Sequence, residues 1–345
     1  MKAGGDDAGV GVARHRRGLR GNGERHQEEE RGGCNLFHDA RIVHKTPATG
    51  RFAPSPTGSL HLGSLAAAVA SWLFARAENG RWLVRMEDID TPRVVTGSAE
   101  EILAALTRYG LEWDGEVLWQ SQRTMRYEAA LQRLRDANLV YDCACSRADL
   151  QRAASAPLGA EPVYAGTCRN GLPPGKAARA IRFRTPDEVI AFDDLLRGRI
   201  EENVAAETGD FVVRRADGLF AYQLAVVVDD AEQGVTQVVR GVDLLDSTAR
   251  QIALQRALGY RTPQYAHIPL VTNPDGSKLG KREGSLPLPA LDEQRIRETL
   301  AAALRHLGIA VGEDAPRAML DEALRLRRFV CNGPEDDVRH PPQRK

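Results

Sequence analysis

The run RFAPSPTGSLHLGS, residues Arg51–Ser64, restricts the possible folds more than any other segment of the chain. Its prolines and glycines fix a tight turn, and apolar residues then recur at the spacing of one helix face: Leu65, Val69, Trp72 and Leu73. Backbone amides at the start of a helix attract phosphate, and Gly63 at that point lets a ligand approach closely. The segment therefore predicts a phosphate-binding turn with His61 beside it.

A second segment, NPDGSKLGKREG at Asn273–Gly284, places Lys278 and Lys281 on a loop bracketed by glycines. Such a loop can close two ammonium groups over a polyphosphate. Alone, each segment has an ordinary explanation, since paired loop lysines are usually solvated and a lone loop histidine usually bonds to its neighbours. Together, and in this order, the segments predict the two phosphate-binding ends of one ATP site.

Helical and extended patterns alternate after the first turn, which is typical of an α/β protein. The expected elements are a helix end at Asn79-Gly80, a buried strand at Trp82–Met86, a helix from a Ser98/Glu101 capping box to Gly110, and a helix at 124–138. Short β-like runs follow at Ala180–Arg184, Val189–Phe192, Phe211–Arg214 and Phe220–Val228. We interpret these runs as an insertion into the α/β domain.

Helical spacing returns after Ser247. It leads to a predicted strand at Tyr265–Val271 and to helices near Asp292–Leu307 and Pro316–Val330. The first 46 residues contain few large apolar side chains, so we expect a disordered tail there, or an artefact of start-codon choice. A second disordered tail is expected after Gly333.

Composition excludes some classes of protein. Lys+Arg and Asp+Glu both number 47, so the overall charge does not indicate a polyanion partner, although a local basic groove remains possible. No run approaches the roughly 20 apolar residues of a membrane span, and the first 46 residues lack a secretory signal. We therefore expect a soluble, cytoplasmic protein.

The five cysteines are odd in number, which argues against a disulfide framework: Cys34, Cys143, Cys145, Cys168 and Cys331. Three of them cluster, as Cys143-Ala-Cys145 followed by Cys168, with Tyr164 four residues before the last.

The two phosphate-binding segments resemble the signatures of class I aminoacyl-tRNA synthetases. The HIGH-type signature is His61-Leu62-Gly63-Ser64, and the KMSKS-type signature is Lys278-Leu279-Gly280-Lys281-Arg282, with Gly280 where a serine usually stands. The runs RFAPSPTG, RMEDIDTPR and RGVDLLDST are similar to those of the glutamyl lineage. The resemblance covers about Arg51 to Leu288.

Within that lineage, the chain resembles the glutamyl-queuosine tRNA(Asp) synthetases, which attach glutamate to the base queuosine. The chain ends soon after the KMSKS-type loop, which leaves no room for the anticodon-reading domain of a full glutamyl synthetase, and Ser64 also matches the shorter subfamily. The implied fold is a Rossmann-type nucleotide-binding domain with an inserted α+β zinc-containing subdomain and a short helical C-terminal part. The implied ranges are a tail at 1–46, the two catalytic halves at 47–140 and 241–290, the insertion at 141–240, C-terminal helices at 291–332 and a tail at 333–345.

The resemblance implies a two-step reaction: tRNA-independent activation of L-glutamate by ATP with Mg²⁺, then transfer of glutamate to queuosine-containing tRNA(Asp), by a monomer. The implied catalytic residues are His61, Lys278 and Lys281, and the implied ATP-binding residues are His61, Gly63, Ser64 and Lys281. Those for glutamate are Arg51, Ala53, Ser55, Glu87, Tyr222 and Arg240. Without the resemblance, Glu87 is a surface carboxylate and Tyr222 an ordinary strand aromatic.

The resemblance also implies one structural zinc ion bound by Cys143, Cys145, Tyr164 and Cys168. Three thiolates and one phenolate would form a closed tetrahedral site. The alternative is three buried thiols with Tyr164 in the core.

Three alternatives for the function stay open at this point. They are a short glutamyl synthetase that charges a tRNA 3′ end, a catalytically inactive RNA-binding paralogue, and an amino-acid ligase that makes a small metabolite.

Overall fold

The computed structural model describes residues 47–146, 148–149, 163–271, 292–312 and 314–326. Two groups of parallel strands form its centre. The first has the order β1 (Thr49–Phe52), β2 (Arg81–Met86), β3 (Leu118–Trp119), and in the second β9 (Gln237–Gly241) pairs with β10 (Gln264–Ile268). Thr236 N donates to Thr49 O at 2.9 Å, which joins the two groups. Parallel strands connected by helices confirm the predicted α/β class.

The remaining strands extend one group and form a separate sheet. β6 (Val189–Asp194) lies parallel to β10, and β7 (Gly198–Asn203) pairs antiparallel with β6. β4 (Val140–Cys143), β5 (Ala180–Phe183) and β8 (Val212–Arg214) form an antiparallel sheet. The predicted insertion therefore contributes strands to the β9–β10 group and to the separate antiparallel sheet. Its exact range of 141–240 stays a prediction.

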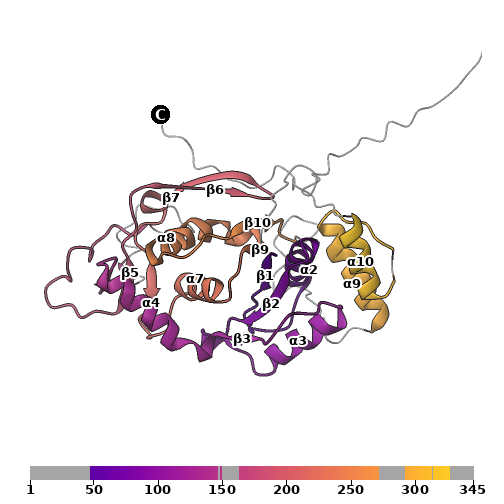
Figure 1. The fold of residues 1–345 in the computed structure, drawn as a ribbon. Helices are drawn as coiled ribbons and strands as arrows, with labels where there is room; N and C mark the ends of the chain where they lie inside the picture. The colour runs from indigo at the N-terminus through magenta and orange to yellow at the C-terminus, as the bar shows by residue number, and fades with distance from the viewer. Residues whose placement is uncertain (1–46, 147, 150–162, 272–291, 313, 327–345) are drawn as a thin grey trace, which may run out of the picture. The chain divides into compact units, whose positions relative to one another are not determined.

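Helix α2 (Leu62–Ala77) is buried between the parallel strands and the C-terminal helices α9 (Glu293–His306) and α10 (Pro316–Leu326) (Figure 1). Its Ala-rich sequence allows this close packing on several sides. The other helices are α3 (Ser98–Arg108), α4 (Thr124–Asp136), α6 (Val204–Glu207), α7 (Tyr222–Glu232) and α8 (Thr248–Leu258), with 3₁₀ turns η1 (Thr91–Arg93), η2 (Gln120–Gln122) and η3 (Val242–Ser247).

The predicted strand at Phe220–Val228 is wrong, because this segment forms helix α7 from Tyr222 onward. Residues from Leu224 to Asp230 are all buried in α7. A helix that is buried on all sides produces a continuous apolar run, which periodicity alone does not distinguish from a buried strand. The three consecutive valines, Val226–Val228, favoured the strand because β-branched residues are common in sheets.

The predicted capping box at Ser98 and Glu101 is also wrong. Gly97, at a φ of 82°, occupies the N-cap of α3, and Ser98 lies inside the helix. The Ser98 hydroxyl donates to Gly58 O at 2.8 Å, and Glu101 accepts from the Ser59 hydroxyl at 2.8 Å. Both side chains therefore stabilise the turn before His61 instead of the helix end.

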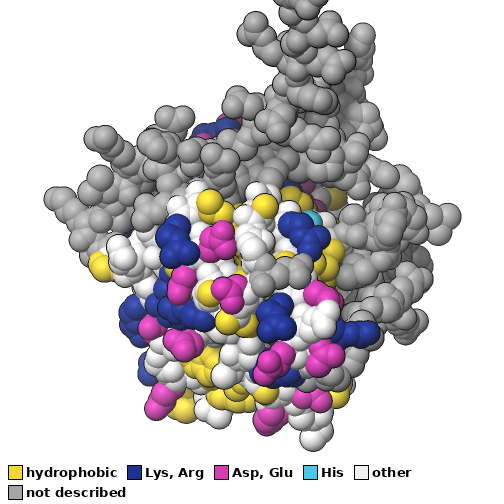
Figure 2. Space-filling model, turned by 90° about the vertical axis from the view of Figure 1, so that its right-hand side faces the viewer, with side chains coloured by type: hydrophobic (Ala, Val, Ile, Leu, Met, Phe, Trp, Pro, Cys, Tyr) yellow, Lys and Arg dark blue, Asp and Glu magenta, His cyan; other side chains and the backbone are white. Residues whose placement is uncertain are grey.

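The other predicted elements lie within a few residues of the observed ones, and the tails and the end of Pro316–Val330 lie outside the described residues. Among the described helices, none combines the length and the apolar composition needed to cross a bilayer. Figure 2 shows acidic and basic side chains interspersed on one face, in keeping with the balanced composition.

Candidate active site

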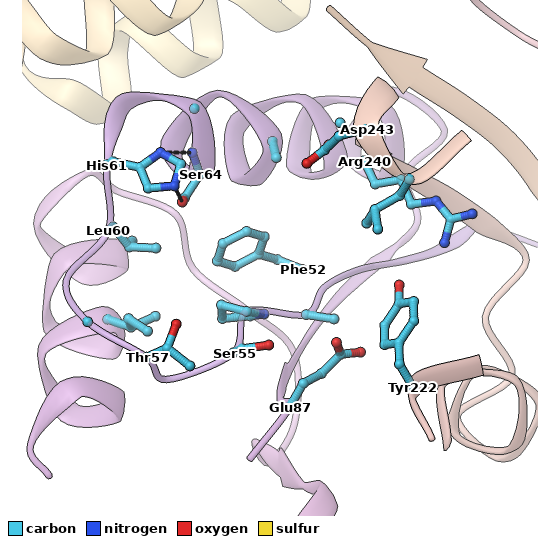
Figure 3. A pocket seen from close by; sticks show the side chains of 18 of the residues that line it. Phe52, Ser55, Thr57, Leu60, His61, Ser64, Glu87, Tyr222, Arg240 and Asp243 are labelled. Atoms are coloured by element: carbon cyan, nitrogen blue, oxygen red, sulfur yellow. Dashed lines mark hydrogen bonds between the residues drawn. The ribbon is translucent and has the colours of Figure 1, made fainter. Parts of the chain in front are cut away.

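A cavity of about 750 Å³ lies between the turn before α2, the end of β2, the start of α7 and the ends of β9 and β10. Nine residues predicted for glutamate or ATP line it: Arg51, Ala53, Ser55, His61, Gly63, Ser64, Glu87, Tyr222 and Arg240. In Figure 3, His61 and Ser64 lie at one end and Glu87, Tyr222 and Arg240 at the other. Lys278 and Lys281 lie outside the described residues.

His61 occupies the N-cap of α2, where its ring is held by Ser64. Ser64 N donates to His61 Nδ1 at 3.2 Å, and the Ser64 hydroxyl lies 3.0 Å from His61 Nε2 (Figure 3). Because Nδ1 accepts, the proton of the neutral ring is on Nε2. A Cβ on Gly63 would lie 3.2 Å from the His61 ring, so a larger residue would crowd it. The result is a helix N-terminus with a fixed imidazole, suited to an anion.

Two buried arginines at the other end share acidic partners. Arg51 Nε donates to Asp230 Oδ1 at 3.1 Å, and Arg85 Nη1 donates to the same oxygen at 2.7 Å. Burial opposes ionisation of Asp230, but the two guanidinium groups lower its pKa below the ordinary value. Arg85 Nη2 also donates to Glu87 at 3.3 Å. Burial dominates at Glu87 and raises its pKa.

Arg240 is different, because the described residues give it no acidic partner. Its Nε donates to His267 Nε2 at 3.0 Å, Nη1 to Gln251 at 2.8 Å and Nη2 to Thr248 at 2.8 Å. Arg240 is only 5% exposed. A buried cation with neutral partners is unfavourable unless an anion joins it, so this wall of the cavity is suited to a carboxylate.

The three predicted thiols form one cluster. The sulfur atoms of Cys143, Cys145 and Cys168 lie within 4.8 Å of one another, and the Cys145–Cys168 separation is 3.7 Å. Sulfurs bound tetrahedrally to one zinc at roughly 2.3 Å would stand about 3.8 Å apart. The cluster is therefore able to hold a metal ion.

The Tyr164 hydroxyl lies 3.5 Å from Cys143 Sγ and 3.9 Å from Cys145 Sγ. The Cys168 amide donates to it at 2.9 Å. Arg182 donates to Cys143 Sγ at 3.3 Å, and its guanidinium lies 3.9 Å from the centre of the Tyr164 ring. The Arg182 donor favours an anionic Cys143, whereas burial raises the pKa of the Tyr164 hydroxyl.

The thiol pKa values differ across the cluster. Burial opposes ionisation of Cys143, but hydrogen bonds from Tyr164 and Arg182 lower its pKa below the ordinary value. Burial and the adjacent Cys168 thiol raise the pKa of Cys145 to about 11.

Sequence reasoning missed the acidic and polar residues that hold the arginines. Asp229 and Asp230 are consecutive charged residues in an apolar run, which is the signal that could have found them. Asp229 is fully buried and accepts from Gln120, Arg123 and Tyr127. Asp194 and His267 carried no such signal, because they approach each other only in the folded sheet.

Comparison with known proteins identifies the family of the chain. The family described as tRNA synthetases class I (E and Q), catalytic domain, matches residues 48–326. The glutamyl-Q tRNA(Asp) synthetase of Geobacter sulfurreducens is 58% identical over 76% of this chain and 85% of its own length. That of Thiobacillus denitrificans is 59% identical over 75% of this chain and 85% of its own length.

A solved structure is similar along most of the chain. It is a glutamate tRNA ligase from Elizabethkingia meningosepticum in complex with its amino acid, with a TM-score of 0.69 and 27% identity over 84% of this chain and 66% of that one. The chain belongs to the class I tRNA synthetases for glutamate and glutamine, and within them to the glutamyl-Q tRNA(Asp) synthetases.

Proposed function

We propose that this protein activates L-glutamate with ATP, without tRNA, and transfers the glutamyl group to the queuosine base of tRNA(Asp). One observation carries the first half of the proposal: Arg240 is a buried cation with neutral partners among the described residues, and it lines the same cavity as the His61 turn. Family membership supports the second half.

The charges of the cavity suit glutamate. Arg51 and Arg85 are paired with Glu87, Asp229 and Asp230, whereas Arg240 has no acidic partner among the described residues. Glutamate at neutral pH has one net negative charge. We assign the side-chain carboxylate to Arg240 and the ammonium group to Glu87, with Tyr222 beside both. Arg51, Ala53 and Ser55 complete the glutamate site.

In the first step, the α-carboxylate oxygen attacks the α-phosphorus of ATP, and the bond to pyrophosphate breaks. Negative charge builds on the phosphate oxygens, so fixed donors supply most of the stabilisation. We assign this role to the Gly63 amide at the start of α2, to the Ser64 hydroxyl, and to His61 Nε2–H, which would exchange its contact with that hydroxyl for a phosphate oxygen. Lys278 and Lys281 are proposed to follow the leaving pyrophosphate, and Mg²⁺ suits the phosphate oxygens.

In the second step, a hydroxyl of the queuosine cyclopentene ring attacks the carbonyl carbon of the adenylate. An ester forms, AMP leaves, and the hydroxyl loses its proton. The anticodon stem-loop would enter the opening of the cavity, and the protein would work as a cytoplasmic monomer.

We further propose that the thiol cluster holds one structural zinc, with Tyr164 as the fourth ligand. A tetrahedral zinc with one oxygen ligand would place that oxygen roughly 3.5 Å from each sulfur, and the Tyr164 hydroxyl lies at 3.5 and 3.9 Å from two of them.

The experiment is ATP–pyrophosphate exchange with and without glutamate, in the absence of tRNA, followed by transfer of labelled glutamate to tRNA(Asp). Glutamate-dependent exchange is expected, and label is expected on queuosine-containing tRNA alone. Periodate-treated tRNA 3′ ends should still accept label, because the ester forms on the base. Exchange that does not depend on glutamate would refute the first step. Equal labelling of unmodified tRNA would refute the second.

A further inference from the structure

Three neighbouring strands carry a chain of buried polar groups that ends at Arg240. Asp194 ends β6, His267 lies in β10 and Arg240 lies in β9. His267 and Arg240 are register partners in the parallel pairing of β10 with β9. Asp194 Oδ2 lies 2.6 Å from His267 Nδ1, and Arg240 Nε lies 3.0 Å from His267 Nε2. The chain therefore runs from a carboxylate, through an imidazole, to a guanidinium.

The Asp194 carboxylate is fixed by the backbone. Its Oδ1 accepts from the amides of Leu196, Arg197 and His267 at 3.0, 3.0 and 3.2 Å. With three amide donors on one oxygen and an imidazole on the other, this side chain is held as an acceptor. It therefore sets which nitrogen of His267 carries the proton.

His267 is held neutral, in one tautomer. Nδ1–H donates to Asp194, so Nε2 carries the lone pair that accepts from Arg240 Nε–H, and the Thr248 hydroxyl lies 3.3 Å from the same nitrogen. Burial lowers the pKa of His267 despite the adjacent carboxylate. A proton on Nε2 would point at the N–H of a permanent cation, so the neutral ring is the form that the sheet stabilises.

The imidazole completes the restraint on the guanidinium plane. Thr248 and Gln251, both in α8, accept from the other two nitrogens of Arg240. Arginine has five N–H donors in a rigid plane, so three bonds within the protein leave two N–H groups for a ligand. A planar fork binds a carboxylate well only when its plane is fixed.

We infer that Asp194 and His267 are positioning residues that orient Arg240 for the substrate carboxylate, and that the pair thereby sets the affinity for glutamate. The inference rests on the proposed function, because it takes glutamate as the ligand of Arg240. Neither residue lines the cavity, so both act through the arginine. If the pair were only structural, its loss would lower stability without changing glutamate binding selectively.

The test compares two amides at position 267 in ATP–pyrophosphate exchange. His267→Gln can place an oxygen near the position of Nε2 and keep an acceptor for Arg240. His267→Asn reaches only the position of Nδ1 and loses that acceptor. We expect His267→Asn to raise the KM for glutamate at least roughly tenfold, because the fork is no longer fixed. The KM for ATP should change little, and His267→Gln should recover most of the loss.

Asp194→Asn is a second, nearly isosteric variant. Its amide group would face Nδ1 as a donor, forcing the proton onto Nε2 against Arg240, so the KM for glutamate should rise here too. Tyr265→Phe is the matched control in β10: it removes a buried hydroxyl that accepts from Gln255 but keeps the ring 5.4 Å from the Arg240 guanidinium carbon. It should lower thermal stability without changing the KM for glutamate.

The outcomes separate the two hypotheses. If the wild-type protein shows no glutamate-dependent exchange, the proposed function fails. If the wild type is active but His267→Asn and Asp194→Asn have the same KM for glutamate as Tyr265→Phe, the positioning role is overturned. Equal impairment of His267→Asn and His267→Gln in folded protein would also overturn it.

Discussion

At the scale of single residues, two buried arginines of the cavity differ in their charged partners. Arg51 and Arg240 line the same cavity and are 3% and 5% exposed. Arg51 is neutralised by Asp230, whereas Arg240 has neutral partners among the described residues. Ligand carboxylate binding should therefore depend more strongly on Arg240.

Arg240→Gln should raise the KM for glutamate by roughly 100-fold, the effect of removing one partner of a buried charge pair. Arg240→Lys should not restore binding, because an ammonium lacks the planar fork. Thermal melting without glutamate should not fall, since an unpaired buried charge is removed. Steady-state ATP–pyrophosphate exchange measures the KM of each variant, and melting curves measure its stability. An unchanged KM would contradict the assignment of Arg240.

Glu202 in β7, which interacts electrostatically with Glu207, Asp246 and Arg250, gives a pH-dependent prediction. Burial, then the carboxylate of Glu207, raises its pKa to about 7. The folded state therefore binds this proton more tightly than the unfolded state, and the protein loses stability as pH rises from the ordinary carboxyl value through about 7. The side chain is only partly buried, so solvent screening limits the effect to roughly 1 kcal/mol.

Glu202→Gln should therefore melt higher than wild type at pH 8, and this difference should close near pH 5. Melting curves across this range are the measurement. A stabilisation of the same size at both pH values would exclude titration of Glu202 as its cause.

At the scale of elements, the C-terminal helices matter because they cover α2. Leu300 in α9 is fully buried in the same hydrophobic core as α2. His61 is the N-cap of α2, so packing on this helix supports the His61 end of the cavity. The same helix therefore links core stability to the site.

Leu300→Ala should lower the free energy of unfolding by about 2–5 kcal/mol, through lost burial and a cavity. Glu298→Ala, on the exposed side of α9, is the control and should change it by less than about 0.5 kcal/mol. Denaturant titration measures both. If the two variants were equally stable, α9 would not contribute to this core as described.

At the scale of the whole molecule, two hydrophobic cores both include residues of β9 and β10. One contains α2, α9 and α10, and the other contains α4, α7 and α8. The thiol cluster forms a third, small core with Tyr141 and Tyr164. Tyr164 pairs with Gly209, where a Cβ would meet Tyr164 O at 2.6 Å, so this small core depends on a glycine.

Metal analysis of purified protein should find one zinc per chain, lost in Cys168→Ser and after chelation. Removal should lower the melting temperature, because the small core has few apolar contacts of its own. Tyr164→Phe should weaken zinc binding while keeping the ring beneath Arg182. Metal-free protein that melts like the untreated one would support the alternative of three buried thiols.

The sequence by itself determined the α/β class, most element positions, the turn before α2 and the thiol cluster. These features depend on local signals: glycine and proline in turns, apolar spacing, and cysteines close together in the chain. The turn itself indicated His61 and Gly63, and the resemblance to a known family supplied the other cavity residues that the structure brings together.

Only the tertiary structure decided which charges are paired. Asp230 reaches Arg51 and Asp194 reaches His267 through contacts between distant parts of the chain, and local sequence contains no record of such contacts. The helical state of α7 was decided in the same way, since burial on all sides outweighed the strand preference of its valines. Electrostatic partners and buried helices depend on what packs against a residue, which a linear pattern does not specify.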